Sequence, residues 1–154
     1  MARIGIADTT FARINMADFA IDIIKKNSSH KIERYTVPGM KDLPVACKIL
    51  FDKYKCDIVV ALGMAGPMPI DKQCSHEASL GLQMVQLMAS KHILEVFVHE
   101  DETKNSKELY QIARNRTEKH AINALELLKN KTVLTKNAGM GKRQGKDDAG
   151  QIKI

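Results

Sequence analysis

Four short apolar runs alternate along the chain with longer segments whose apolar residues recur every three or four positions. The runs lie at residues 3–8, 31–39, 56–64 and 93–100, and their length and composition predict strands. The segments at 9–27, 42–55, 71–92 and 105–130 have the spacing of amphipathic helices. Because strands and helices alternate, the pattern predicts an α/β fold with a four-stranded parallel sheet and helices on both faces.

Local features support several of these elements. The run CDIVVALGM at 56–64 is almost entirely apolar, which is typical of a strand buried on both faces of a parallel sheet. Asp42 is placed to cap the second helix, and Pro44 suits its first turn. Asn105 or Ser106 is expected to cap the fourth helix.

The charge distribution divides the chain into one predicted domain, residues 1–131, and a Gly/Lys-rich tail, residues 132–154, expected to be mobile on its own. The net charge is +6, but residues 129–154 hold seven Lys/Arg against two Asp and so carry +5 of it. The preceding part is therefore almost neutral. With no Trp and few other aromatic residues, a basic, aromatic surface for nucleic acid is not expected.

Other features of the composition favour a cytoplasmic protein. The longest apolar run is far shorter than the roughly 20 residues that a membrane span needs, so no membrane partner is expected. The pattern at the N-terminus enters a strand at once, without the features of a signal peptide. Three cysteines without metal-type spacing are read as reduced thiols.

The segments that follow the four predicted strands form the predicted ligand site, because ligands bind beyond the carboxyl ends of parallel strands. They read TTFAR after the first strand, PGMKD after the second, GMAGPMP at the end of the third and HEDE after the fourth. GMAGP brings backbone amides close to a ligand but lacks the lysine and spacing of a P-loop and is no dinucleotide fingerprint.

Individual residues in these segments and on the third predicted helix allow more than one interpretation. Phe11 could pack against the following helix or stack on a flat heteroaromatic ring. Asp42 could be only a helix cap, or it could accept hydrogen bonds from a polyol. His76 and Glu77 could form a solvated pair on the third helix. The acidic run after the fourth strand could hold Mg²⁺ through its oxygens, although neighbouring residues rarely all face one ion.

The ordered segments resemble the lumazine synthase family, and within it the archaeal-type riboflavin synthases. The similarity covers roughly residues 3–130 and is carried by IGIADTTF, VPGMKDLPVACKIL, YKCDIVVALGMAGP, HEASLGLQMVQL and HAINALELL. It implies a flavodoxin-like three-layer sandwich, a homo-oligomer that is a pentamer with sites between subunits, and stimulation by Mg²⁺. The implied substrate-binding residues are Thr10, Phe11, Pro38, Gly39, Met40, Asp42, Met64, Ala65, Gly66, Phe97 and His99. The reaction needs an anion to be stabilised and protons to be moved, so the candidate catalytic residues are Lys41 for the first task and His76 or Glu77 for the second. Glu100 and Asp101 are the candidate ligands of Mg²⁺.

The chain departs from the lumazine synthases in one segment. Those enzymes have a longer Arg-Gly…His segment after the third strand, and the shorter GMAGPMPIDKQCSHEASLGL has no histidine at that place. Their phosphate-binding basic residues match only Arg114 and Arg116, and only approximately. The resemblance therefore implies the dismutation of two 6,7-dimethyl-8-ribityllumazine molecules into riboflavin and 5-amino-6-ribitylaminouracil. Lumazine synthesis and non-catalytic binding of a flavin-like ligand are the alternatives.

Overall fold

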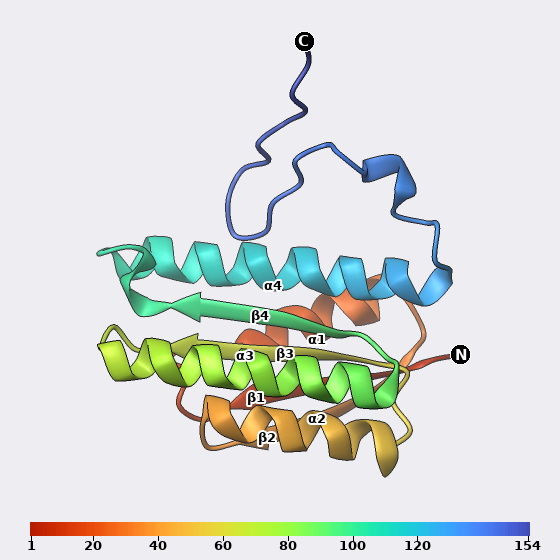
Figure 1. Cartoon of the computed structure of the whole chain (residues 1–154), viewed down its shortest axis with the longest axis horizontal. Coiled ribbons are helices and arrows are strands. Elements are labelled where there is room, and N and C mark those ends of the chain that lie inside the picture. Colours follow the sequence, from red (N-terminus) through yellow and green to blue (C-terminus); the bar gives the residue numbers. More distant parts are fainter.

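A computed structural model describes all residues, 1–154, and contains the four strands and four long helices that the pattern predicts (Figure 1). The strands are all parallel and lie in the order β2-β1-β3-β4. The elements are β1 (Arg3–Thr9), α1 (Met16–Asn27), β2 (Lys31–Val37), α2 (Leu43–Asp52), β3 (Ile58–Ala65), α3 (Pro69–Ala89), β4 (Ile93–His99) and α4 (Ser106–Lys129), with short 3-10 helices at Met40–Asp42, Glu100–Glu102 and Thr135–Asn137.

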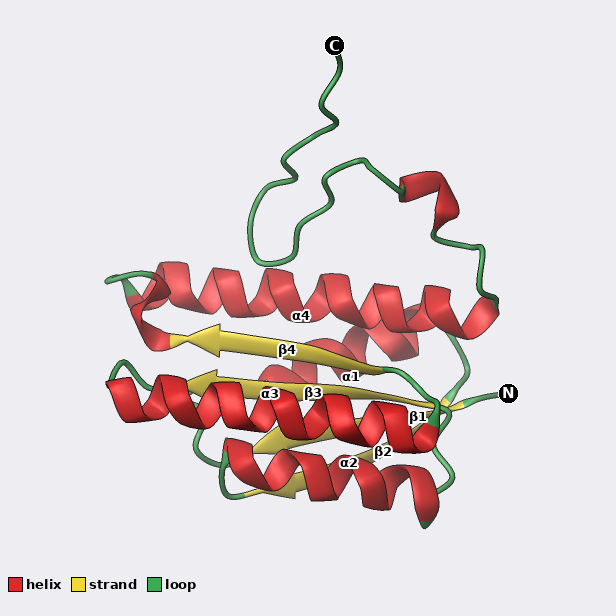
Figure 2. Ribbon diagram, viewed as in Figure 1, coloured by secondary structure: helices red, strands yellow, loops and turns green.

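The sheet lies between two pairs of helices, which confirms the predicted three-layer architecture (Figure 2). Helices α1 and α4 pack together on one face, and α2 and α3 on the other. Every residue of β3 is buried, as expected for the near-continuous apolar run. The side chains of β3 alternate between two hydrophobic clusters, with Val60 and Leu62 facing α1 and α4, and Val59 and Ala61 facing α2 and α3.

The helix starts differ from the sequence predictions at two places that matter for the site. The first helix begins only at Met16, so residues 10–15 form a loop beyond β1. The third begins at Pro69, two residues before the predicted start, because proline suits the first position of a helix. Of the two predicted caps, Asn105 and Ser106, it is Asn105 that caps α4, by accepting hydrogen bonds from the amides of Lys107 and Glu108.

The helices α3 and α4 are the longest elements of the chain, but none of the helices is long and apolar enough to cross a membrane. Both follow strands on the β3–β4 side of the sheet. Their N-terminal ends therefore lie at the same edge as the loops after β1 and β2, on the left of Figure 1. A ligand site is expected at this edge, because the strand order reverses between β1 and β3.

Candidate active site

A cavity of about 200 Å³ opens at the carboxyl edge of the sheet. Its walls come from the loop after β1, the loop and 3-10 helix after β2, the end of β3 and the first turns of α3. The residues that line it are Phe11, Gly39, Met40, Lys41, Asp42, Ala65, Asp71 and Cys74. Six of these eight belong to the predicted site, so three separate sequence segments meet here as the topology requires.

Backbone hydrogen bonds hold the loop after β1 against the loop after β2. The amide of Thr10 donates to the carbonyl of Val37 over 2.9 Å, and the amide of Phe11 donates to the carbonyl of Pro38 over 3.1 Å. The Thr10 hydroxyl reaches the same Pro38 carbonyl over 3.3 Å. The loop is therefore fixed while the Phe11 side chain stays 52% exposed, which leaves its ring face available for a flat ligand.

The turn after β2 is organised by Asp42. Its carboxylate accepts a hydrogen bond from the amide of Gly39 over 3.0 Å and makes no capping bond to α2. Asp42 occupies the expected N-cap position, but its side chain turns back toward the Pro-Gly turn. Met40 is buried beneath this turn, and its terminal methyl group lies so close to Gly63 of β3 that a Cβ there would be 2.7 Å away. A side chain at position 63 would therefore displace the end of the Met40 side chain.

Lys41 and Glu77 form an ion pair at the mouth of this cavity. The Lys41 ammonium lies 2.8 Å from the Glu77 carboxylate. The hydrogen bond to Glu77 raises the pKa of Lys41. The hydrogen bonds from Lys41 and from Gln73 lower the pKa of Glu77. Both groups thus stay charged at neutral pH, and Glu77 holds the lysine where it lines the cavity.

A second, more polar cavity of about 420 Å³ lies between α3 and α4, above β4. Its walls include three predicted residues, His76, Phe97 and His99. His76 therefore points to the opposite side of α3 from the cavity that Lys41 lines. The other residues around it are Lys72, Ser75, Ser79, Glu95 and Arg116. Within one chain, the predicted substrate residues form two separate groups.

Four further predicted residues, Thr10, Pro38, Met64 and Gly66, do not line either cavity. Met64 is buried in the cluster under α1 and α4, so only its backbone can face a ligand at the edge. Gly66 is buried directly after β3. Thr10 and Pro38 take part in the loop-to-loop hydrogen bonds described above.

Glu100 and Asp101 form ion pairs with two different basic side chains. Glu100 pairs with Arg13 over 2.8 Å, and Asp101 pairs with Lys72 over 2.5 Å. The hydrogen bond from Lys72 lowers the pKa of Asp101. No group of three or more His, Cys, Asp or Glu side chains is arranged to hold a metal ion. Glu100 and Asp101 are therefore each engaged by a basic side chain, and their role as Mg²⁺ ligands stays a prediction.

Asp71 and Cys74 line the first cavity without having been singled out in the sequence. They are three residues apart in the first turns of α3, so they lie on one helix face. Asp71 accepts a hydrogen bond from the amide of Met68 over 3.1 Å and so caps the helix. In the sequence, the feature that could have identified them is their separation of three residues, shortly after Gly66, which directly follows β3.

The chain is similar in sequence to known proteins over its whole length. The family model described as 6,7-dimethyl-8-ribityllumazine synthase matches residues 1–132, and the chain belongs to this family. The riboflavin synthase of Methanothermobacter thermautotrophicus is 54% identical over 99% of this chain and 100% of its own length. The riboflavin synthases of Archaeoglobus fulgidus and Aeropyrum pernix are 51% and 43% identical, each covering 97% of this chain and 98% and 97% of their own lengths.

The role of Asp42 can be separated into a structural part and a charge part. Asp42→Ala removes the acceptor for the Gly39 amide and is expected to lower the free energy of unfolding by about 0.5–2 kcal/mol, as for other lost caps. Asp42→Asn keeps an acceptor oxygen and should retain most of that stability. If the charge also binds a ligand hydroxyl, Asp42→Asn should still weaken ligand affinity. Chemical denaturation and ligand titration of both variants distinguish the two parts, and unchanged stability in Asp42→Ala would contradict this account of the turn.

Proposed function

We propose that this protein is a riboflavin synthase that transfers a four-carbon unit between two molecules of 6,7-dimethyl-8-ribityllumazine. The products are riboflavin and 5-amino-6-ribitylaminouracil. The observation that carries the proposal is the full-length similarity, at 54% identity, to proteins with this activity. The cavity beside Phe11 and the Pro-Gly turn supports it, because it offers an exposed aromatic ring next to polar groups.

The two candidate phosphate-binding arginines favour riboflavin synthase over lumazine synthase. Arg116 makes two hydrogen bonds of 2.8 Å to the carboxylate of Glu102, and Arg114 pairs with Glu118 over 2.9 Å. Arg116, which is largely buried, is thus fully paired within the chain, whereas the Arg114–Glu118 pair lies at the surface. A lumazine synthase must bind a phosphate-bearing substrate, whereas dimethylribityllumazine carries no phosphate.

The size of the first cavity supports a site shared between subunits. Pockets that enclose a small molecule commonly measure about 300–1,000 Å³, and this one measures only about 200 Å³. The reaction also requires two flat rings held together. We propose that the first cavity of one chain faces the second cavity of a neighbouring chain, so that Phe11 and the turn at 39–42 bind one side and Phe97 and His99 the other.

In this arrangement most of the catalysis is juxtaposition of the two substrates. The reaction needs no external oxidant or reductant, because one lumazine gives up the unit that the other gains. The acidic methyl group of the lumazine must lose a proton, and negative charge then develops on its ring. We propose that Lys41 stabilises this charge, and that Glu77, which holds Lys41, and His76 of the neighbouring chain are the groups that move protons.

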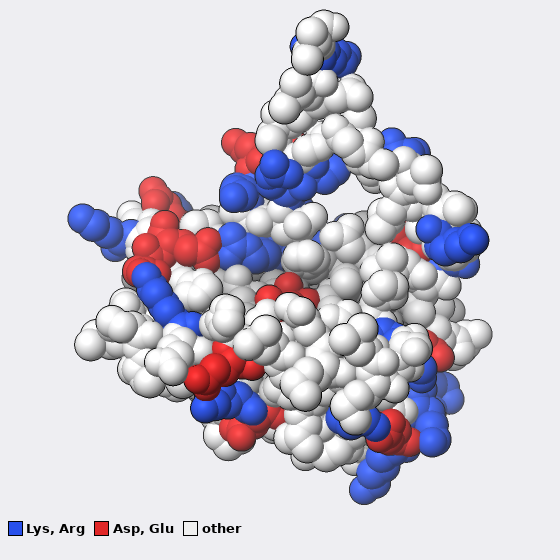
Figure 3. Space-filling model, viewed as in Figure 1, with Lys and Arg blue, Asp and Glu red and all other residues white.

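The pentamer implied by the family resemblance is also part of the proposal. Four large apolar side chains of α3, Leu80, Met84, Leu87 and Met88, are between 49% and 82% exposed. Over α3, the surface in Figure 3 is mostly free of charged residues. A contiguous apolar helix face of this kind is expected to be covered by protein, and a symmetric ring of identical copies would cover it.

Two further expectations accompany the proposal. Stimulation by Mg²⁺ stays a prediction from the family resemblance, and no catalytic step is assigned to the ion. Removing the metal with a chelator and adding Mg²⁺ back during turnover tests it. We also propose a cytoplasmic location, which the three free cysteines support.

The function is tested by incubating the purified protein with dimethylribityllumazine as the sole organic substrate. One riboflavin should appear for every two lumazine molecules consumed. If the protein instead makes lumazine, and does so only with a four-carbon phosphate donor, it is a lumazine synthase. Tight binding of lumazine without turnover would identify a non-catalytic binding protein.

Lys41→Met tests the proposed charge stabilisation. If the ammonium acts mainly on the transition state, kcat should fall by about 10²–10³, the scale seen when one stabilising donor is removed, while KM changes little. Lys41→Arg keeps a positive charge and should retain more activity than Lys41→Met. Wild-type kcat in Lys41→Met would remove Lys41 from the mechanism.

The oligomer is tested by placing a charge on the exposed face of α3. Leu87→Glu should break the assembly into smaller species, because an unpaired carboxylate would be buried at the contact. Val45→Glu, on the exposed part of α2, is the matched control. Sedimentation velocity gives the molar mass in each case. A monomeric wild-type protein, or a Leu87→Glu variant of unchanged mass, would contradict the proposal that this face of α3 is a contact between subunits.

A further inference from the structure

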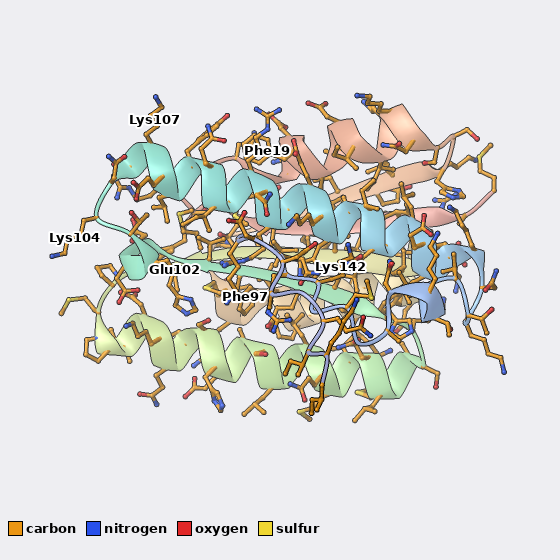
Figure 4. The ribbon with its side chains drawn as sticks, turned by 90° about the horizontal axis from the view of Figure 1, so that it is seen from above. Phe19, Phe97, Glu102, Lys104, Lys107 and Lys142 are labelled. Carbon is orange, nitrogen blue, oxygen red and sulfur yellow. The ribbon has the colours of Figure 1, made fainter.

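The C-terminal tail returns to the body of the protein and forms a closed loop there. After α4 the chain folds back along the helix (Figure 1). In Figure 4 it crosses above α4 and β4, with Lys142 on the crossing segment. The amide of Ala149 donates to the carbonyl of Gly141 over 2.8 Å, and the amide of Arg143 donates to the carboxylate of Asp148 over 3.0 Å. These two bonds close a loop at residues 141–149, which we call the C-terminal loop.

The C-terminal loop binds α4 through its backbone, which explains how a basic segment can lie on basic side chains. The Lys119 ammonium donates to the carbonyls of Arg143 and Lys146 over 3.0 and 3.2 Å. The amide of Gly145 donates to the side-chain oxygen of Asn115 over 2.9 Å. Because backbone carbonyls of the loop accept the hydrogen bonds of the Lys119 ammonium, the lysine side chains of the loop itself can extend into solvent.

Gly145 lets the C-terminal loop approach Arg116 closely. Its φ of +82° lies in the left-handed region that favours glycine. A Cβ at this position would lie 2.5 Å from two nitrogens of the Arg116 guanidinium, well inside contact distance. The neighbouring carbonyl, of Gln144, accepts a hydrogen bond from Nε of Arg116 over 3.2 Å. A side chain at 145 would therefore separate the loop from Arg116.

Arg116 connects this loop to the end of β4. Its guanidinium donates to the carbonyl of Phe97 over 3.1 Å and to both carboxylate oxygens of Glu102. Glu102 in turn accepts a hydrogen bond from the amide of His99 over 2.8 Å. Burial pushes the pKa of Glu102 up, but the hydrogen bonds from Arg116 and from the His99 amide outweigh this and leave that pKa lowered. The carboxylate therefore stays ionised at neutral pH.

We infer that the C-terminal loop is a positioning element for the substrate-binding surface on β4. The carbonyl of Gln144 in this loop accepts the hydrogen bond from Nε of Arg116, the one guanidinium nitrogen that does not bind Phe97 or Glu102. The Arg116 side chain, only 15% exposed, is thereby held in place, and it in turn fixes the backbone of Phe97 and His99. The inference rests on the proposed function, in which these two residues meet the second lumazine. The loop touches no reacting atom in this account and acts only through Arg116 and Glu102.

The test uses Gly145→Val, with Gly139→Val as the matched control. Gly139 has a φ of +76° but no atom within 4 Å of its Cβ position, so both variants strain the backbone and only one displaces Arg116. Gly145→Val should lower kcat for lumazine about tenfold with a smaller change in KM, because the alignment of two bound rings is lost. Gly139→Val should stay within about twofold of wild type on both constants, because it leaves that alignment intact. Equal effects of the two substitutions, or wild-type kinetics in Gly145→Val, would overturn the inference.

A second measurement does not depend on turnover. Hydrogen exchange of the His99 amide should become faster in Gly145→Val and stay at the wild-type rate in Gly139→Val. Two truncations check the same point: a chain that ends at Ala149 should keep slow exchange, and one that ends at Met140 should lose it. Unchanged exchange in both Gly145→Val and the shorter chain would overturn the inference. Failure of the proposed function would appear separately, as absence of riboflavin from wild-type protein.

Discussion

The parallel pairing of the four strands is the constraint on which both halves of the proposed site depend. Parallel strands have all their carboxyl ends at one edge of the sheet. The fully buried strand β3 lies between β1 and β4, so loops from distant parts of the sequence meet on either side of it. Helix α3 then rises from the end of β3 and separates the two cavities, with Cys74 facing one and His76 the other.

Around this edge, cationic side chains are paired with carboxylates. Arg13 pairs with Glu100, Lys41 with Glu77, Lys72 with Asp101 and Arg116 with Glu102. Each of these four basic side chains therefore already has a carboxylate partner within the chain. This pairing is consistent with the proposed substrate, which carries no phosphate.

The sequence predicted those features that follow from periodicity and from the topology of parallel strands. The order of the elements, the cap at Asn105 and the convergence of Phe11 with the Pro-Gly turn are of this kind. The direction of the Asp42 carboxylate was not predictable, because an N-cap position allows a side chain to bond forward or backward. The contact of Gly145 with Arg116 also escaped prediction, since it joins residues far apart in the chain through a backbone carbonyl and a left-handed glycine.

The most direct test of a site shared between two chains is complementation between two inactive variants. Phe11→Ala should damage one half of every site and Phe97→Ala the other half. When the two chains are produced together in equal amounts, random assembly should leave about a quarter of the sites with both halves intact. Mixed oligomers are expected to regain riboflavin formation at about that fraction of wild-type activity. Mixed oligomers no more active than the two separate variants would contradict a site shared between two chains.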